Sequence, residues 1–379
     1  MNEKMKSRSF LIKIVFAFSL FLIFLTLLIL SAEVIFRFTN KYPLAAFQLS
    51  SNEIWRIEKK LYNKKTTEEG NHFTLITNQD GFRGEKPVEI KPDDVIRILI
   101  LGDSYTAGLD YSDEQIFTGQ FSTLLNADSA VHKKFEIINT GVPAWAIDQQ
   151  WQYFLNDGLK LHPDYVLLIA SPNDIRETFC KKFVTSSSGK SLIVHQPEFS
   201  FTKKAGWYLS TRFSFFQYLQ EKVFKSNYGT MADVFEMYPV NFGTEDLTDW
   251  DRPLYLKKPF QDVIDAQNLY EKIFIEIKDK CIEQNIKFGT CLNVVLTRYD
   301  STYSKDTSCS VNEMENYFIK LTNKHAIPFL NLNKATDSLS NPRELFMQND
   351  YHYSQIGHRF IGEQLYHFFI TEFLSPSVR

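Results

Sequence analysis

The sequence predicts an α/β domain in which five strands form a parallel sheet with helices on both faces. Three observations support this prediction: strand-like and helix-like segments alternate from residue 95 onward, the strand-like segments are short apolar runs, and turn-forming residues follow several of them. The chain has 379 residues, of which 44% are hydrophobic and 23% charged. This composition is ordinary for a globular protein with a substantial core.

The expected strands are marked by apolar runs of strand length. Residues 95–101 form a run rich in β-branched side chains that ends at a glycine. A shorter run over 135–139 ends at Thr140-Gly141, and a fully apolar run over 165–170 ends at Ser171. The remaining strands are expected over 287–296 and 327–332.

The expected helices separate and follow these strands. Apolar side chains recur at helical spacing within residues 144–161, at Trp145, Ile147, Trp151, Phe154 and Leu155. Ser354 has the side chain of an N-cap and precedes the last expected helix. The expected helices cover 114–125, 144–161, 262–284, 311–325 and 354–373.

An apolar segment near the N-terminus predicts a membrane anchor. Residues 14–32 carry no charge, and about twenty apolar residues cross a bilayer as a helix. Basic residues precede the segment, so we expect a single-pass protein with a cytoplasmic N-terminus and the remaining chain outside, periplasmic or extracellular. A cleaved signal peptide is the alternative, but its apolar region is usually about 7–15 residues, and Leu30-Ser31-Ala32 matches a cleavage site poorly.

These segments divide the chain into three parts. Residues 1–38 are the cytoplasmic tip and anchor, 39–94 a connector, and 95–376 the α/β domain with an insertion over about 183–258. The insertion could form a lid or substrate platform. We predict instead that most of its aromatic residues are buried in a helical cap packed on the domain. These residues are Trp207, Tyr208, Phe213, Phe215, Phe216, Tyr218, Tyr228, Phe235, Tyr238, Phe242, Trp250 and Tyr255.

Charge and cysteine content limit the expected partners. The formal net charge of −3 gives no indication of a nucleic-acid partner. The four cysteines contain no CxxC pair, so we expect no zinc site, and we expect no other metal or cofactor. An outward-facing domain could oxidise some thiols, and the spacing leaves disulfides and buried free cysteines both open. The cysteines are Cys180, Cys281, Cys291 and Cys309.

Four short blocks supply the groups that acyl transfer from an ester needs: Gly102-Asp103-Ser104, Gly141, Asn173-Asp174 and Asp350-x-His352. Ser104 would be the nucleophile and His352 its base, with Asp350 fixing the imidazole tautomer. The backbone N–H groups of Ser104 and Gly141 and the Asn173 amide would form the oxyanion hole.

Each residue also has a structural alternative. Ser104 and Asn173 could cap helices, Gly141 could serve only a turn, and His352 could be a surface histidine. Four blocks in this order favour the catalytic interpretation, because the alternatives require four independent coincidences. Asp174 in its loop and His358 in the last helix are expected to be structural. Arg83 could pair with a carboxylate near the site, but we expect a surface arginine.

The blocks resemble those of the GDSL esterases, also called SGNH hydrolases, from about Asn78 to Phe373. The resemblance implies a flavodoxin-like three-layer α/β/α domain that hydrolyses or transfers O-acyl groups without a metal. Ser104, Gly141, Asn173 and His352 match the family's serine, glycine, asparagine and histidine. Asn78-x-x-Gly81-Phe82-Arg83 is similar to bacterial members that carry a membrane anchor.

Two positions depart from the family pattern. Ser171 stands where the third block usually has glycine, and Asn349 stands three residues before His352, where the family usually has aspartate. Some relatives that act on polysaccharide acetyl groups use Asp-x-His, so Asp350 is the expected partner of His352. If Asn349 occupied that place instead, the histidine would lack a negative orienting group.

Three functions fit the sequence. The first is a membrane-anchored, outward-facing serine esterase that removes O-acyl groups, most simply acetyl, from an envelope glycan, lipid or small ester. The second is an O-acetyltransferase for a cell-envelope polysaccharide, which uses the same serine and needs an acyl donor that a membrane partner could deliver. The third is a non-catalytic glycan-binding protein, supported only by Ser171 and the Asp350 spacing.

Overall fold

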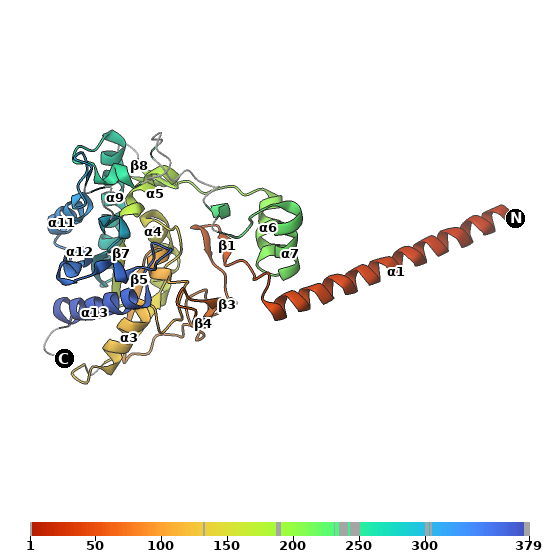
Figure 1. Ribbon diagram of the computed structural model, residues 1–379, viewed down its shortest axis with the longest axis horizontal. Helices are drawn as coiled ribbons and strands as arrows, with labels where there is room; N and C mark the ends of the chain where they lie inside the picture. The colour runs from red at the N-terminus through yellow and green to blue at the C-terminus, as the bar shows by residue number, and fades with distance from the viewer. Residues whose placement is uncertain are drawn as a thin grey trace.

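The central element is a five-stranded parallel sheet (Figure 1). The computed structural model describes all residues except 1, 132, 187–190, 231, 235–241, 243–250, 300–302, 304 and 375–379, and it leaves out the side chains of residues 2–9. The strands are β5 (Val95–Leu101), β6 (Lys134–Asn139), β7 (Tyr165–Ala170), β10 (Lys287–Leu292) and β11 (Phe329–Asn331). Their spatial order is β11-β10-β7-β5-β6, which is the flavodoxin-like order and confirms the predicted fold class.

Helices cover both faces of the sheet. Alternate β5 side chains enter the two cores: Ile98 and Ile100 on one face, Leu99 and Leu101 on the other. The first face packs against α3 (Phe117–Ala127) and α13 (Gln355–Glu372). The second packs against α4 (Ile147–Asn156), α5 (Pro172–Lys181), α9 (Gln261–Glu283) and α11 (Glu313–His325).

The predicted boundaries differ most from the structure in two elements. The helix expected over 144–161 begins at Ile147, because Ala144 has a left-handed backbone (φ 59°), and it ends at Asn156 before the short 3₁₀ helix η1 (Gly158–Leu161). The strand expected over 287–296 ends at Leu292, and the chain turns into η4 (Leu296–Tyr299). Shorter helical turns precede α13: α12 (Leu332–Ala335), η5 (Thr336–Ser338) and η6 (Pro342–Leu345).

The N-terminal helix α1 (Asn2–Thr39) extends away from the α/β domain (Figure 1). Its residues 10–39 form a helix long and apolar enough to cross a membrane, and its most apolar stretch is not buried against the protein. A membrane anchor and a signal sequence both have these properties.

Residues 39–94 fold onto the domain as two antiparallel hairpins. One joins β1 (Phe47–Ser50) to β2 (Ile54–Ile57), and the other joins β3 (Tyr62–Thr66) to β4 (His72–Ile76). Trp55 Nε1 donates to the carbonyl of Pro143 at 3.0 Å, and Trp145 Nε1 donates to the carbonyl of Trp55 at 2.8 Å. Both indoles are buried, so they attach the first hairpin to the loop before α4.

The described part of the insertion holds a hairpin and two short helices. The hairpin joins β8 (Val184–Ser186) to β9 (Leu192–Val194), and α6 (Phe201–Ser210) precedes α7 (Ser214–Leu219) and the π-helical turn η2 (Gln220–Phe224). After a further gap, η3 (Arg252–Tyr255) leads to α9. Trp207 and Tyr255 are buried as predicted, whereas Tyr208 and Phe213 are exposed. The other described aromatic residues are half-buried, so fewer of them are buried than predicted; they are Phe215, Phe216, Tyr218, Tyr228 and Phe242. Phe235, Tyr238 and Trp250 lie outside the described residues.

The four cysteines are all buried with free thiols. Burial raises the pKa of the Cys180 thiol to about 11, so this group stays protonated at neutral pH.

Candidate active site

Ser104 begins α2 (Ser104–Ala107) directly after β5. The turn that carries it is tight, because a Cβ on Gly102 would lie 2.1 Å from Thr106 Oγ1. Asp103 Oδ1 accepts a hydrogen bond from the Tyr105 N–H at 3.0 Å and caps the helical turn. Ser104 follows the carboxyl end of β5, the edge of the sheet where such folds bind ligands, and it is only partly buried there.

Arg83 holds the other end of α2. Its guanidinium donates to the carbonyls of Ala107 (3.2 Å), Gly108 (2.8 Å) and Tyr111 (2.7 Å), and the residue is buried. The interpretation of Arg83 as a surface residue is therefore wrong. A buried charge needs such partners, and here they are the carbonyls at the end of the turn that presents Ser104.

His352 is oriented by Asp350. Asp350 Oδ1 lies 2.7 Å from His352 Nδ1 and accepts the His352 backbone N–H at 3.0 Å. The hydrogen bond from His352 lowers the pKa of the Asp350 carboxyl to about 2. Within the described structure, His352 Nε2 is buried and has no hydrogen-bond partner. An ionised Asp350 favours the proton on Nδ1, which leaves the Nε2 lone pair available.

Asn349 has a different partner from the one the family pattern suggests. Its backbone N–H and its side-chain Nδ2 both donate to Glu68 Oε1 at 2.8 Å. The carboxylate that contacts the His352 ring is thus that of Asp350, two residues earlier in the chain, and Asn349 does not make this contact.

The histidine loop lies against the serine turn. Tyr105, the residue after Ser104, donates from its hydroxyl to the Tyr351 carbonyl at 3.0 Å, and its ring centroid lies 5.2 Å from that of His352. Tyr353 anchors the loop to the end of β10 by donating to the Val294 carbonyl at 2.9 Å. Among the described residues, Ser104 and His352 make no direct hydrogen bond. The structure therefore brings the two segments together but does not form the Ser104–His352 hydrogen bond. In many enzymes such a bond tightens only when substrate binds.

Asn173 lies in the first turn of α5, at the end of the neighbouring strand β7. The N-cap of this helix is Ser171, with Asp174 accepting the Ser171 N–H at 2.9 Å, so capping is not the role of Asn173. Asn173 Nδ2 donates to Glu177 Oε1 at 3.0 Å. One of its two amide protons is thereby fixed, and the other remains available to a ligand.

Buried acidic groups lie beneath the site. Burial raises the pKa of Asp103 to about 6, opposed by hydrogen bonds from Ser171 and Tyr105 and by the charge of His352. Burial and the charge of Asp103 raise the pKa of Asp174 well above its usual range. Glu177 is the exception, since the charges of Lys181 and Arg176 outweigh its burial and hold its pKa below the ordinary value. Asn173 is therefore held by an ionised carboxylate.

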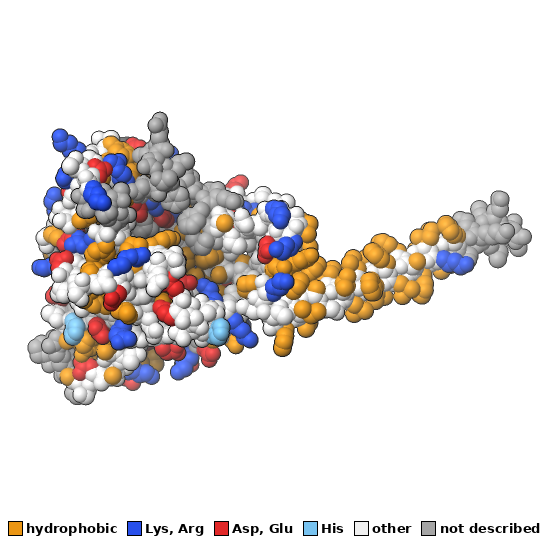
Figure 2. Space-filling view, in the orientation of Figure 1, with side chains coloured by type: hydrophobic (Ala, Val, Ile, Leu, Met, Phe, Trp, Pro, Cys, Tyr) orange, Lys and Arg blue, Asp and Glu red, His pale blue; other side chains and the backbone are white. Residues whose placement is uncertain are grey.

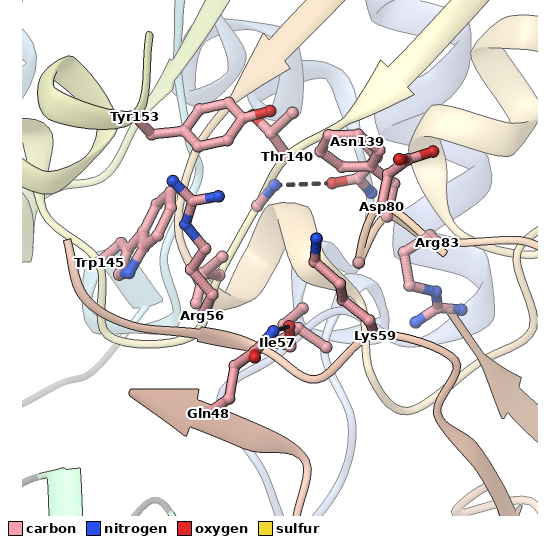
Figure 3. A pocket seen from close by; sticks show the side chains of 14 residues that line it. Gln48, Arg56, Ile57, Lys59, Asp80, Arg83, Asn139, Thr140, Trp145 and Tyr153 are labelled. Carbon is pink, nitrogen blue, oxygen red and sulfur yellow. Dashed lines mark hydrogen bonds between the residues drawn. The ribbon is translucent and has the colours of Figure 1, made fainter. Parts of the chain in front are cut away.

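Gly141 lies against α2, because a Cβ there would fall 2.5 Å from Ala107 N. Its N–H donates to Asn139 Oδ1 at 2.9 Å, the dashed line at Asn139 in Figure 3. The predicted oxyanion role would use this same N–H, so Gly141 as a donor stays a prediction.

Ala144 lies in the same loop as Gly141 and has a backbone conformation that the sequence did not reveal. It is buried in a left-handed conformation, its carbonyl accepts a hydrogen bond from Lys181 Nζ, and no described group accepts from its N–H. Strained backbone of this kind clusters at active sites. Glycine is the usual signal for a left-handed residue, and an alanine gives none.

A small, partly open hollow borders the same loop (Figure 3). It shares Gly141 with the predicted site, but Ser104 and His352 are not part of its wall. Residues between 48 and 83 supply one side of the hollow, and residues between 139 and 153 supply the other. The labelled side chains are Gln48, Arg56, Ile57, Lys59, Asp80, Arg83, Asn139, Thr140, Trp145 and Tyr153.

No protein-family model matches the chain, and a search of curated proteins found no relative. Solved structures are similar at low identity. One is a lipase/acylhydrolase from Enterococcus faecalis, with 14% identity, 74% of this chain and 98% of that chain covered, and a TM-score of 0.41. Another is an acetylxylan esterase, Axe2, from Geobacillus stearothermophilus, with 10% identity, 72% of this chain and 93% of that chain covered, and a TM-score of 0.40. A third is the acetyl xylan esterase AlAXEase, with 16% identity, 72% of this chain and 98% of that chain covered, and a TM-score of 0.39. At these identities and TM-scores, the assignment of chemistry rests on this chain's own residues.

Proposed function

We propose that this protein is a serine esterase that hydrolyses O-acyl esters through an acyl-enzyme. The observation that carries the proposal is the state of His352: Asp350 holds Nδ1, and Nε2 is buried without a partner beside the turn that presents Ser104. A histidine in this state is a general base for a neighbouring hydroxyl.

The steps follow from these positions. His352 Nε2 takes the Ser104 proton as the hydroxyl oxygen attacks the ester carbonyl, and the Asn173 amide with the Ser104 N–H and a loop N–H donate to the oxyanion. The bond to the leaving alcohol breaks, and His352 returns the proton to that alcohol. Water then attacks the acyl-Ser104 ester by the same route and releases the acid.

The place of action is part of the proposal. The apolar helix α1 would hold the enzyme in a membrane, and the basic residues before its charge-free stretch favour a cytoplasmic N-terminus. The esterase domain would then face outward, toward acylated envelope glycans, lipids or small esters.

The test is hydrolysis of p-nitrophenyl acetate by the full chain in detergent. We expect Ser104→Ala and His352→Ala each to lower kcat/KM by at least about 10³-fold. Ser338→Ala removes an exposed serine on η5 and should leave the rate unchanged. Equal rates for the Ser104→Ala variant and the unaltered protein would refute the proposal.

A further inference from the structure

The helix α7 is fixed to the last turns of α1. The Glu33 carboxylate of α1 accepts the backbone N–H groups of Ser214 (3.1 Å) and Phe215 (2.7 Å), which are otherwise unpaired at a helix start. The Phe36 ring of α1 lies 5.4 Å from that of Tyr218. Figure 1 shows α6 and α7 beside the end of α1, away from the central sheet.

This attachment sets the height of α7 relative to a bilayer. Glu33 is the first charge after the charge-free residues 14–32. Nineteen helical residues span about 28 Å at ~1.5 Å each, close to the ~30 Å hydrocarbon core of a bilayer. If α1 crosses the membrane, Glu33 lies at the edge of the hydrocarbon, and the start of α7 lies at headgroup level.

The surface of α6, α7 and η2 is suited to that level. Large apolar side chains are exposed on it: Tyr208 (62%), Phe213 (45%), Val223 (57%) and Phe224 (57%). Residues 201–225 carry five basic side chains (Lys203, Lys204, Arg212, Lys222 and Lys225) and one acidic side chain, Glu221. Lys203 and Arg212 form ion pairs with Asp233 and Glu58, and Lys222 pairs with Glu221 within the segment. Figure 2 shows hydrophobic and basic side chains next to each other at this end of α1.

We infer that residues 201–225 form a membrane-docking unit that binds the surface of an anionic phospholipid bilayer. This inference rests on the proposed anchoring by α1. Aromatic and aliphatic side chains enter the interface while basic side chains pair with headgroups, the pattern of helices that lie on membranes. The covalent link through α1 keeps the unit at the bilayer, so weak lipid contacts suffice to hold the domain in one orientation.

The test places a fluorophore at single introduced cysteines in the full chain, reconstituted into vesicles. The four native cysteines are buried and should not react. Phe224→Cys labels the unit, Phe24→Cys labels α1, and Ile282→Cys labels an exposed site on α9, on the far side of the domain from α1 in Figure 1. Doxyl-labelled lipids quench a fluorophore that contacts the bilayer.

We expect quenching at positions 24 and 224 but not at 282. Quenching at 224 should be at least about twofold stronger in vesicles containing phosphatidylglycerol than in phosphatidylcholine alone. Lys222→Glu with Lys225→Glu brings the unit from four net positive charges to none, so it should abolish that preference and leave position 24 unchanged. Quenching at 24 with none at 224 would overturn the docking unit alone, and no quenching at 24 would overturn the anchor and the unit together. Ester hydrolysis is measured separately and bears on neither.

Discussion

Asp350 and Asn349 are neighbours in sequence with separate tasks. Asp350 contacts the imidazole of His352, while Asn349 faces Glu68 on the loop between β3 and β4. In the proposed mechanism the Asp350 carboxylate fixes which ring nitrogen of His352 carries the proton, so its charge should matter more to catalysis than its size.

Asp350→Asn should lower kcat for p-nitrophenyl acetate by about 10³–10⁴-fold with little change in KM, because an amide allows the unproductive tautomer of His352. Stopped-flow or steady-state assays measure the effect. Asn349→Ala is the matched control and should cost less than about tenfold. If Asn349→Ala were the more damaging change, Asp350 would not be the orienting group.

Ala144 offers a second test at the scale of one residue. A left-handed conformation costs an alanine about 1 kcal/mol, a cost that glycine does not have. Ala144→Gly should therefore leave the free energy of unfolding within about 1 kcal/mol of the parent and keep activity. Ala144→Val should lower both, since a β-branched residue resists this conformation. Urea unfolding and ester hydrolysis measure the pair, and an active, stable valine variant would contradict the assignment.

At the scale of elements, the strands and the serine turn were predictable because their signals are local. The runs over 95–101 and 165–170 match β5 and β7 residue for residue. The hairpins β1–β2 and β3–β4 were missed, because they are short and owe their order to contacts far along the chain, such as Trp55 with Pro143. The burial of Arg83 and the free Nε2 of His352 likewise depend on packing between distant segments.

The contact between the β3–β4 loop and the histidine loop has a testable consequence. Glu68 accepts the backbone N–H groups of Gln348 (2.6 Å) and Asn349 (2.8 Å), so it limits movement of the loop that carries Asp350 and His352. Glu68→Ala should lower kcat by about tenfold, because it loosens catalytic positioning. The exposed site should limit the stability change to about 1 kcal/mol.

Glu69→Ala is the control for this prediction, since Glu69 follows directly but accepts from the Tyr111 hydroxyl instead. We expect it to retain most of the kcat. A Glu68→Ala variant with unchanged kcat would show that the hairpin does not position the histidine loop.

At the scale of the whole molecule, buried titratable groups give folding a pH dependence. His358 is buried and accepts the Phe117 N–H on Nδ1 at 3.2 Å. Burial, with the charges of Arg83 and His352, lowers its pKa to about 3, against about 6.5 in an unfolded chain. Below pH 6.5 the unfolded state therefore binds more protons at this histidine than the folded state does. The free energy of unfolding then decreases as the pH is lowered, by on the order of 3 kcal/mol at pH 4.

Two buried aspartates act in the opposite direction. Burial raises the pKa values of Asp103 and Asp148 to about 6, so the folded state gains protons on them as the pH falls from 7 toward 4 and is stabilised. The pH profile of the unaltered protein thus contains opposing contributions of similar size.

A comparison with His358→Gln isolates the histidine, because the amide can still accept the Phe117 N–H but does not titrate. We expect this variant to be less stable than the parent at pH 8 through lost packing, and the difference to shrink or reverse by pH 4. Urea unfolding at both pH values measures it, and a constant difference would mean that His358 takes up a proton in the folded protein.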